Sequence, residues 1–170
     1  MGKGTLSIIA TPIGNLEDIT VRALRVLGEL DAVACEDTRR TRAIYEHYEL
    51  RRPRTILSYH RHNEAAAGSR ILRMLDGGAV VGLVSNAGYP CISDPGYLIV
   101  RRAIDAGHRV EVLPGASAVP NALIASGLPC KGYAFLGFLP RKPGALARTL
   151  AGSVTSPHTL VCFEAPGRVE

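Results

Sequence analysis

The sequence lacks the features of several protein classes. No apolar run approaches 18 residues, which argues against a membrane-spanning helix. The first apolar stretch is too short for a secretory signal, so we expect a cytoplasmic protein. Four widely spaced cysteines include no C-x-x-C pair, which gives little support to a metal site or a disulfide framework. We expect four reduced cysteines, several of them buried.

Three common ligand motifs are also missing. No G-x-G-x-x-G follows the first predicted strand, and no G-x-x-x-x-G-K-[ST] occurs anywhere, so dinucleotide and P-loop phosphate sites lack their fingerprints. No G-x-S-x-G is present, which argues against a hydrolase nucleophile elbow. A pocket shaped by glycine and proline would offer mainly backbone groups. Such a pocket suits a neutral or zwitterionic ligand better than a triphosphate.

The composition fits a folded, basic protein. Hydrophobic residues make up 46% of the chain and mean hydropathy is +0.11, so a core is expected and global disorder is not. The net charge is +5, and 17 of the 20 basic residues are arginine. The planar guanidinium binds phosphate well, which weakly favours a nucleic-acid partner.

Strand and helix patterns alternate along the first two thirds of the chain. This order predicts an α/β domain over residues 1–114, with a five-stranded, mostly parallel sheet covered by helices on both faces. Asp18 and Asn63 are candidate helix caps, and Gly77 is a candidate helix stop. The predicted strands are 5–10, 31–36, 55–59, 79–84 and 109–114, and the predicted helices are 18–30, 38–48, 63–78 and 97–107.

A second α/β domain is predicted to begin after this sheet. Its elements are a helix at 117–127, a strand at 133–139, a helix at 144–152 and a strand at 159–165. Two strands and two helices are few for a domain, so residues 115–170 are interpreted as the start of a truncated one.

Five polar, turn-rich loops follow the strands of the first domain. Ligands of open parallel sheets bind beyond the carboxyl ends of the strands, so these loops predict a site along that edge. The longest is "SNAGYPCISDPG", and its length exceeds that of most strand-to-helix connections. The loops are 11–18, 36–40, 60–64, 85–96 and 114–118.

Six motifs in order carry a family resemblance. Together they resemble the ribosomal RNA small-subunit methyltransferase I family, part of the tetrapyrrole-methylase superfamily of S-adenosylmethionine-dependent enzymes. The resemblance covers about residues 5–168. The motifs are "ATPIGNLEDITVRAL", "EDTRRTR", "SYHRHNE", "ISDPGYLIVRRAI", "PGASA" and "GFLPRK".

This resemblance implies a tetrapyrrole-methylase-like fold of two α/β domains, with S-adenosylmethionine held in the cleft between them, and commonly a homodimer. It implies methylation of the ribose 2′-oxygen of a cytidine in the decoding region of small-subunit (16S) ribosomal RNA, so the partner would be that RNA or the 30S subunit. It also implies the cofactor-binding residues Pro12, Asn86, Ala87, Gly88, Asp94, Pro95, Gly96, Ser117, Ala118 and Leu136.

The ligand-facing loops supply candidates for catalysis. Methyl transfer needs the oxygen and the methyl carbon held in line, and a poorly acidic ribose hydroxyl needs a base or a positive field. The spacing does not choose among five candidates. Two of them, at 36 and 37, could instead cap the next helix, and the histidines could be solvated loop residues. The candidates are Glu36, Asp37, His60, His62 and Glu64.

Six arginines within 16 residues could neutralise RNA phosphates, with only Glu46 and Glu49 opposing them. The same cluster could be a solvated helix face. The RNA-binding candidates are Arg39, Arg40, Arg42, Arg51, Arg52 and Arg54, joined by Arg141 and Lys142.

The chain departs from the family pattern in its longest loop. The family usually has S-D-A-G-T-P-G-I-S-D-P-G, where this chain has Asn86, Tyr89 and Cys91 at the second, fifth and seventh positions. Two other functions stay open. One is a methylase of the same superfamily that acts on a tetrapyrrole. The other is a catalytically inactive fragment that binds RNA or a partner.

Overall fold

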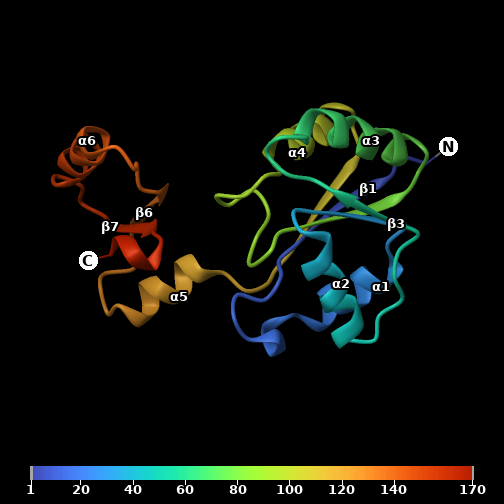
Figure 1. Cartoon of the computed structure of the whole chain (residues 1–170), viewed down its shortest axis with the longest axis horizontal. Coiled ribbons are helices and arrows are strands. Elements are labelled where there is room, and N and C mark those ends of the chain that lie inside the picture. The colour runs from blue at the N-terminus through green and yellow to red at the C-terminus, as the bar shows by residue number, and fades with distance from the viewer. Residues whose placement is uncertain (1, 170) are drawn as a thin grey trace. The chain divides into compact units, whose positions relative to one another are not determined.

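The computed structural model describes residues 2–169, which form two compact units. The first contains residues 2–116 and the second residues 117–169 (Figure 1). The division falls close to the predicted boundary at 114. That residues 115–170 are the start of a truncated second domain stays a prediction.

The first unit is built on a five-stranded parallel sheet in the order β3-β2-β4-β1-β5. Strand β1 pairs with β4 on one side and with the edge strand β5 on the other, with Ile9 opposite both Val84 and Leu113. The fold class predicted from the alternating pattern is therefore confirmed. The strands are β1 (Thr5–Ile9), β2 (Ala32–Cys35), β3 (Thr55–Ser58), β4 (Val80–Val84) and β5 (Arg109–Leu113).

Two helices cover each face of the sheet, because alternate strand residues point to opposite faces. Leu6 and Leu83 are buried with α3 and α4, whereas Ile9 and Val84 are buried with α1 and α2. Each fully buried aliphatic side chain stabilises the fold by roughly 1.5–3 kcal/mol. The helices are α1 (Val21–Glu29), α2 (Thr38–His47), α3 (Glu64–Asp76) and α4 (Tyr97–Asp105).

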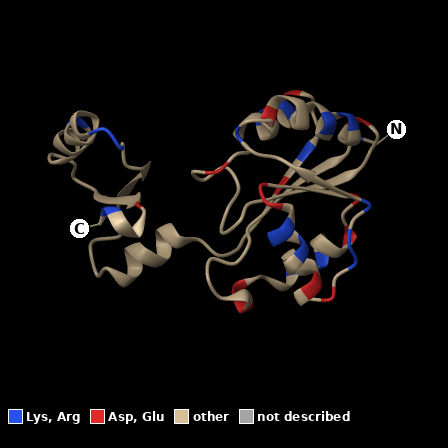
Figure 2. Cartoon of the chain, in the orientation of Figure 1, with Lys and Arg blue, Asp and Glu red and all other residues tan. Residues whose placement is uncertain are grey.

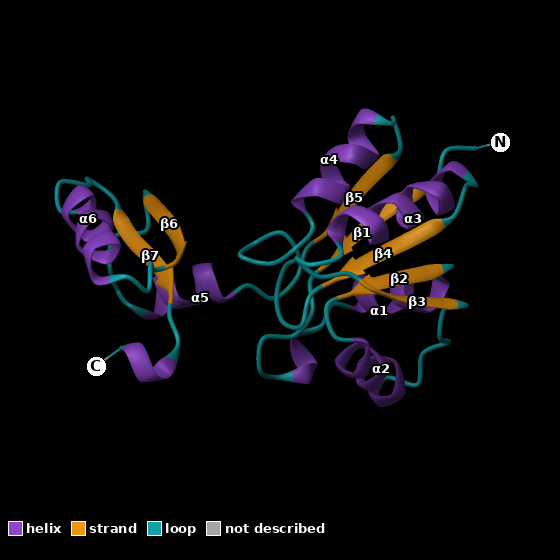
Figure 3. Cartoon of the chain, turned by 45° about the horizontal axis from the view of Figure 1, so that its top comes forward, coloured by secondary structure: helices purple, strands orange, loops and turns teal. Residues whose placement is uncertain are grey.

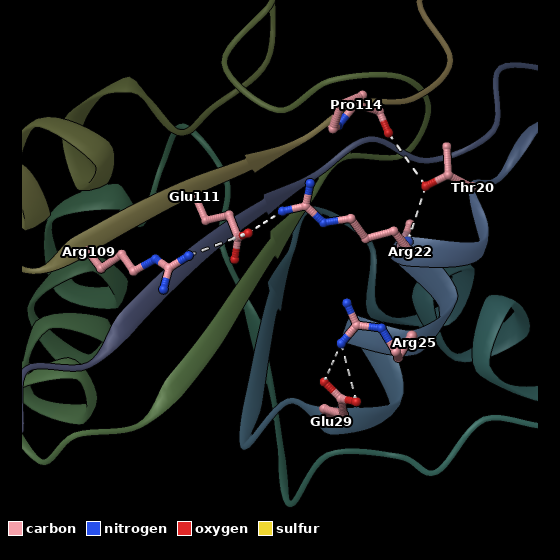
Figure 4. Close-up of polar contacts among 8 residues, drawn as sticks. Thr20, Arg22, Arg25, Glu29, Arg109, Glu111 and Pro114 are labelled. Atoms are coloured by element: carbon pink, nitrogen blue, oxygen red, sulfur yellow. Dashed lines mark hydrogen bonds and ion pairs between the residues drawn. The ribbon is translucent and has the colours of Figure 1, made fainter.

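The edge strand β5 is less apolar than predicted. Arg109 and Glu111 point to the α1 side, where Glu111 forms an ion pair with Arg22 of α1 (Figure 4). The hydroxyl of Thr20, the residue before α1, donates to the carbonyl of Pro114, the residue after β5, at 3.5 Å. These contacts attach the start of α1 to β5 through polar groups rather than through a continuous apolar face.

Two predicted helix starts need correction. Asp18 does not cap α1, because it ends a separate 3-10 turn, η1 (Leu16–Asp18), and Thr20 caps α1 instead. Asn63 occupies the N-cap position of α3 but makes no cap bond to the helix. Its side chain accepts from His60 N at 2.8 Å and donates to the Ser58 carbonyl at 2.9 Å. The amide therefore shapes the loop between β3 and α3.

The second unit pairs two parallel strands, β6 and β7, and its aromatic rings Phe135 and Phe163 lie 4.8 Å apart. Its Cys130 and Cys162 are exposed, so of the four cysteines only Cys35 is fully buried, fewer than predicted. The elements are α5 (Ala118–Ala125), β6 (Tyr133–Phe138), α6 (Pro143–Ser153), β7 (Thr159–Phe163) and the turn η2 (Pro166–Arg168).

Residues 2–169 contain neither a candidate membrane-spanning helix nor a candidate metal-binding cluster. No helix in that range is long and apolar enough to cross a membrane. No group of three or more His, Cys, Asp and Glu side chains there could hold a metal ion.

Candidate functional site

The loops that follow the strands of the first unit gather at one edge of the sheet (Figure 3). This is the edge where the sequence predicted a ligand site. The longest loop, residues 85–96 between β4 and α4, forms hydrogen bonds with the loops after β1, β3 and β5. The side chain of Asn86 in this loop also donates to Glu36, the residue that follows β2.

The start of the long loop is joined to the loop after β1. Thr11 and Gly88 exchange two backbone hydrogen bonds of 2.9 Å, and the Thr11 hydroxyl donates to the Ser85 carbonyl at 3.2 Å. Gly88 has φ of +72°, a left-handed conformation that favours glycine. The Ser85 hydroxyl donates back to the Gly88 carbonyl at 3.0 Å. The turn at residues 85–88 is therefore held in one conformation.

Tyr89 joins the same loop to the loop after β5. Its hydroxyl accepts from the backbone N–H of Gly115 at 2.9 Å. The side chain is half-buried, so the bond is partly shielded from water. A residue that departs from the family pattern thus connects two of the predicted ligand loops.

The second half of the loop has an unusual backbone. Cys91 and Ser93 have φ of +72° and +64°, values uncommon for residues with a side chain. Arg61 supports this turn by donating to the Ser93 carbonyl at 2.9 Å. Burial, followed by the charges of Asp94 and Glu64, raises the pKa of the Cys91 thiol to about 11.

Glu64 supports the end of the loop. Its Oε1 accepts from the backbone N–H of Gly96, where α4 begins, and from the hydroxyl of Tyr59, both at 3.2 Å. A carboxylate is favoured at a helix N-terminus, where backbone N–H groups lack partners. Burial, and then the Glu64 charge, raises the pKa of Tyr59. Oε1 of Glu64 is thus already engaged in hydrogen bonds that hold the 85–96 loop at the start of α4.

A hollow of about 460 Å³ opens beside this loop, at the ends of β2, β3 and β4. It brings together five residues that the sequence named for catalysis, cofactor binding or RNA binding. The residues that line it are Glu36, Asp37, Thr38, Arg39, Ser58, His60 and Asn86.

Asn86 and Glu36 form one polar pair in this hollow. The Asn86 Nδ2 donates to Oε2 of Glu36 at 2.9 Å. Glu36 is exposed and Asn86 is half-buried, so both can be reached by a ligand. Burial and then the charge of Glu36 raise the pKa of the nearby Asp94 carboxyl. The edge is therefore acidic on the side of the long loop.

Asp37 acts as the helix cap that the sequence allowed. Its Oδ1 accepts from the Arg39 backbone N–H at 2.9 Å, and its Oδ2 pairs with the Arg39 guanidinium at 2.9 Å. The hydrogen bonds from Arg39 hold the pKa of Asp37 down at about 2. A carboxylate of such low basicity is a poor proton acceptor near neutral pH.

The two predicted loop histidines differ in position. The His60 and His62 rings lie 5.9 Å apart, but only His60 lines the hollow, and His62 is exposed outside it. The Nδ1 atom of His60 is buried and has no hydrogen-bond partner within residues 2–169. His60 is thus the histidine of this edge that a bound substrate would meet.

The predicted RNA-binding arginines do not form one free surface. Arg51 donates to the Gly28 carbonyl at 3.1 Å, and Arg52 pairs with Glu46. Basic residues also lie over α3 and α4, so charge alone does not single out an RNA surface (Figure 2). The remaining candidates are exposed: Arg39, Arg40, Arg42 and Arg54 in the first unit, and Arg141 and Lys142 in the second.

The other predicted cofactor residues divide between the two units. Pro12 and Pro95 are half-buried and Ala87 is exposed, all on loops at the edge of the first sheet. Ser117 precedes α5 and Ala118 begins it, and Leu136 lies in β6, so these three belong to the second unit. Cofactor contact by any of them stays a prediction.

Sequence reasoning missed several residues that build this edge. Thr11 and Ser85 are buried polar residues at the ends of β1 and β4, and their hydroxyls fix the turn around Gly88. Arg61 stands inside the quoted motif "SYHRHNE" but was not singled out. The sequence did carry a signal for Thr11 and Ser85, because each is a polar residue that directly follows an apolar stretch.

Sequence comparison finds relatives that are longer than this chain. The chain is 46% identical over 168 residues to Ribosomal RNA small subunit methyltransferase I of Halalkalibacterium halodurans, covering 99% of this chain and 57% of that protein. It is 49% identical over 164 residues to the protein of the same name from Mesorhizobium japonicum, covering 96% and 55%. The chain thus spans little more than half the length of these relatives.

Structure comparison and a family model agree on the fold. A crystal structure of diphthine synthase matches with a TM-score of 0.66 at 20% identity, covering 96% of this chain and 66% of that one. A crystal structure of uroporphyrin III C-methyl transferase from Thermus thermophilus matches with a TM-score of 0.56 at 22% identity. This match covers 81% of this chain and 61% of that one. The model of the tetrapyrrole (corrin/porphyrin) methylases matches residues 5–170. The chain therefore belongs to the tetrapyrrole (corrin/porphyrin) methylase family.

Proposed function

We propose that this chain is part of an S-adenosylmethionine-dependent methyltransferase that methylates the ribose 2′-oxygen of a cytidine in the decoding region of small-subunit ribosomal RNA. The observation that carries the proposal is the set of relatives named ribosomal RNA small subunit methyltransferase I, with 42–49% identity over nearly the whole chain. Acting on ribosomal RNA would place the protein in the cytoplasm, and a homodimer stays a prediction from the family resemblance.

The first-unit edge fits the cofactor of this family. S-adenosylmethionine supplies a methyl group from a positively charged sulfur, and its amino and carboxylate groups form a zwitterion, so its net charge is positive. The half-buried carboxyl of Asp94 beside the exposed Glu36 gives the edge a favourable negative field. At Gly88 an added Cβ would lie 3.4 Å from Ile13, so the turn keeps its backbone close to that side chain. Gly88, Asp94 and Pro12 would hold the cofactor.

The chain's own residues would position the RNA and accept a proton. Two of the five catalytic candidates are committed elsewhere, because Asp37 caps α2 and Glu64 bonds the start of α4. Glu36 and His60 line the hollow and can meet a ribose hydroxyl. Much of the rate enhancement of such a displacement comes from holding the reacting atoms in line.

The test is transfer of a labelled methyl group from S-adenosylmethionine. Small-subunit particles lacking the modification, free 16S RNA and uroporphyrinogen III serve as alternative acceptors. We expect label in RNA, retained in a dinucleotide that resists alkaline cleavage, as a 2′-O-methyl group requires. Label in the porphyrinoid alone would support the tetrapyrrole alternative. Because the relatives are longer, the assay includes a chain extended to their length.

Two histidine substitutions, one in the hollow and one outside it, test whether His60 takes part in methyl transfer. His60→Ala is expected to lower the rate of methyl transfer at saturating RNA, whereas His47→Ala, an exposed histidine at the end of α2, leaves it unchanged. RNA bound without any methyl transfer by the extended chain would instead support an inactive binding protein.

A further inference from the structure

The face of the sheet that α1 covers is polar near the start of β1 and β5. A sheet covered on both faces is normally built from continuous apolar strands. On this face, however, Thr5 of β1 lies opposite Arg109 of β5, and Ser7 lies opposite Glu111. Ser7 is only 1% exposed, so a hydroxyl is buried where an aliphatic side chain is expected. A core-packing role does not explain this group of residues.

A second hollow, of about 220 Å³, opens over these residues, and we call it the α1 hollow. Its floor comes from β1, β4 and β5, and its wall comes from α1. It shares no lining residue with the hollow at the ends of β2, β3 and β4. Three arginines line it, Arg22 and Arg25 from α1 and Arg109 from β5 (Figure 4).

The guanidinium groups of the α1 hollow outnumber its carboxylates. Glu111 pairs with Arg22, and the nearest nitrogen of Arg109 lies 3.8 Å from the same carboxylate, beyond hydrogen-bond distance. Arg25 pairs with Glu29 at 3.2 Å at the surface. Three arginines against two glutamates leave one excess positive charge. Because each guanidinium carries five N–H donors, most of these donors are left for a ligand.

This set of groups fits a phosphate group. Arginine binds phosphate oxygens through paired N–H donors, and a serine hydroxyl can donate a further hydrogen bond. The side chains of Arg25 and Arg109 are 61% and 71% exposed, so a ligand can reach them, while Ser7 offers its hydroxyl at the floor. A cation would meet the excess positive charge, and an apolar ligand would leave the donors without partners.

We infer that the α1 hollow binds a phosphate group. Arg25 and Arg109 contact the phosphate oxygens, and Ser7 donates from the floor. Arg22 stays paired with Glu111 and fixes the position of α1 over the strands.

The α1 hollow lies next to the predicted ligand edge. The hydroxyl of Thr20, directly before α1, bonds the carbonyl of Pro114 in the loop after β5. An RNA strand bound at that edge can therefore continue along α1 to the hollow. The choice of an RNA phosphate as the natural ligand rests on the proposed function, whereas the binding of phosphate does not.

The first test uses inorganic phosphate and needs no methyl transfer. The ¹⁵N-labelled 170-residue chain is titrated with sodium phosphate, or with sodium chloride at the same ionic strength, and the arginine Nε–H signals are followed. Phosphate is expected to shift the signals of Arg25 and Arg109 saturably at millimolar concentration. The signal of Arg101, an exposed arginine of α4, should not follow. Equal shifts with chloride, or equal shifts at Arg101, would overturn the inference.

Two substitutions test the sign of the electrostatic effect. Arg109→Gln removes a positive charge and is expected to weaken phosphate binding roughly two- to fivefold. Glu111→Gln removes a competing carboxylate and is expected to tighten binding by a similar factor. Arg101→Gln and Glu46→Gln, the same changes in exposed ion pairs elsewhere, should have no effect. Wild-type affinity in Arg109→Gln, or weaker binding in Glu111→Gln with an otherwise unchanged amide spectrum, would overturn the assignment.

Binding of a short single-stranded RNA of mixed sequence identifies the source of the phosphate. Each phosphate contact adds to the salt dependence of binding, so the loss of one lowers the slope of log K against log salt by about one. The double variant Arg25→Gln/Arg109→Gln is expected to bind RNA more weakly and with a smaller slope, whereas Arg101→Gln keeps both. Unchanged RNA binding by a double variant that no longer binds phosphate would keep the phosphate site and reject RNA as its ligand.

The two proposals can fail separately. Phosphate binding in the α1 hollow without methyl transfer by the extended chain would keep the site and reject the proposed activity. In an active chain, Arg25→Gln/Arg109→Gln is expected to raise the KM for RNA with little change in kcat, because the hollow does not include the residues proposed for methyl transfer. Methyl transfer with no phosphate binding and an unchanged KM would keep the activity and reject the site.

Discussion

Replacing Glu64 by alanine should destabilise the first unit strongly, although this residue belongs to a loop motif named as catalytic. Its Oε1 accepts from the Gly96 N–H and from the hydroxyl of Tyr59, which is 1% exposed. Hydrogen bonds to a charged group contribute about 1.5–3 kcal/mol each when their loss leaves a buried group unpaired, and the two share one acceptor. We therefore expect a loss of roughly 2–4 kcal/mol in the free energy of unfolding.

Urea unfolding followed by circular dichroism measures this loss. With a slope of about 2 kcal/mol per molar urea, the midpoint should fall by roughly 1–2 M. Glu64→Gln keeps an acceptor oxygen without the charge and should lose less. Tyr59→Phe removes only one of the two bonds, and the double variant should show a coupling of about 0.5 kcal/mol or more, because the two residues are in contact.

A matched surface variant gives the reference. Glu29 pairs with Arg25 at 3.2 Å, with both side chains about 60% exposed, so Glu29→Ala is expected to cost less than about 0.5 kcal/mol. If Glu64→Ala were no more destabilising than Glu29→Ala, or if Glu64 and Tyr59 showed no coupling, the structural role assigned to Glu64 would be refuted.

Three further predictions concern the same edge. Tyr89→Phe leaves the Gly115 N–H without its acceptor and should cost about 1 kcal/mol while speeding amide exchange at Gly115; unchanged exchange would contradict the bond. The hydrogen bonds from Arg39 lower the pKa of Asp37 to about 2 in the folded protein. The ionised Asp37 side chain therefore stabilises the fold at pH values above its pKa in the unfolded chain. This stabilisation is lost as the pH falls through the pKa of Asp37 in the folded protein. The difference in melting temperature between wild type and Asp37→Asn should thus be constant above about pH 5 and vanish near pH 2. With a thiol reagent at pH 8, the exposed Cys130 and Cys162 should react first, because burial raises the pKa of both Cys35 and Cys91; four equally fast thiols would contradict this.

The fold was largely predictable because its signals are local. A continuous apolar strand such as 80–84 indicates a sheet covered on both faces, and helices that alternate with strands indicate parallel connections. The helix start at Thr20 was harder, because Asp18 and Thr20 are both good caps and only tertiary contacts choose between them. The polar face of β5 was missed for a similar reason, since Glu111 is satisfied by Arg22, which is distant in the sequence.

The site was predictable as an edge but not as a set of partners. Parallel strands place their carboxyl ends together, so the sequence could assign Glu36, His60 and Asn86 to one side of the sheet. It could not show that Asn86 bonds Glu36, or that Glu64 bonds the start of α4, because these contacts join residues 50 and 32 positions apart. The choice among the five catalytic candidates depends on such long-range contacts.

The most direct test of the account is a calorimetric titration of S-adenosylmethionine into the folded chain. We predict one binding site of micromolar affinity. Gly88→Val should weaken it, because this change places a branched side chain at a left-handed backbone position close to Ile13. A folded chain, tested both at 170 residues and extended to the length of its relatives, that released no binding heat at millimolar S-adenosylmethionine would contradict the account.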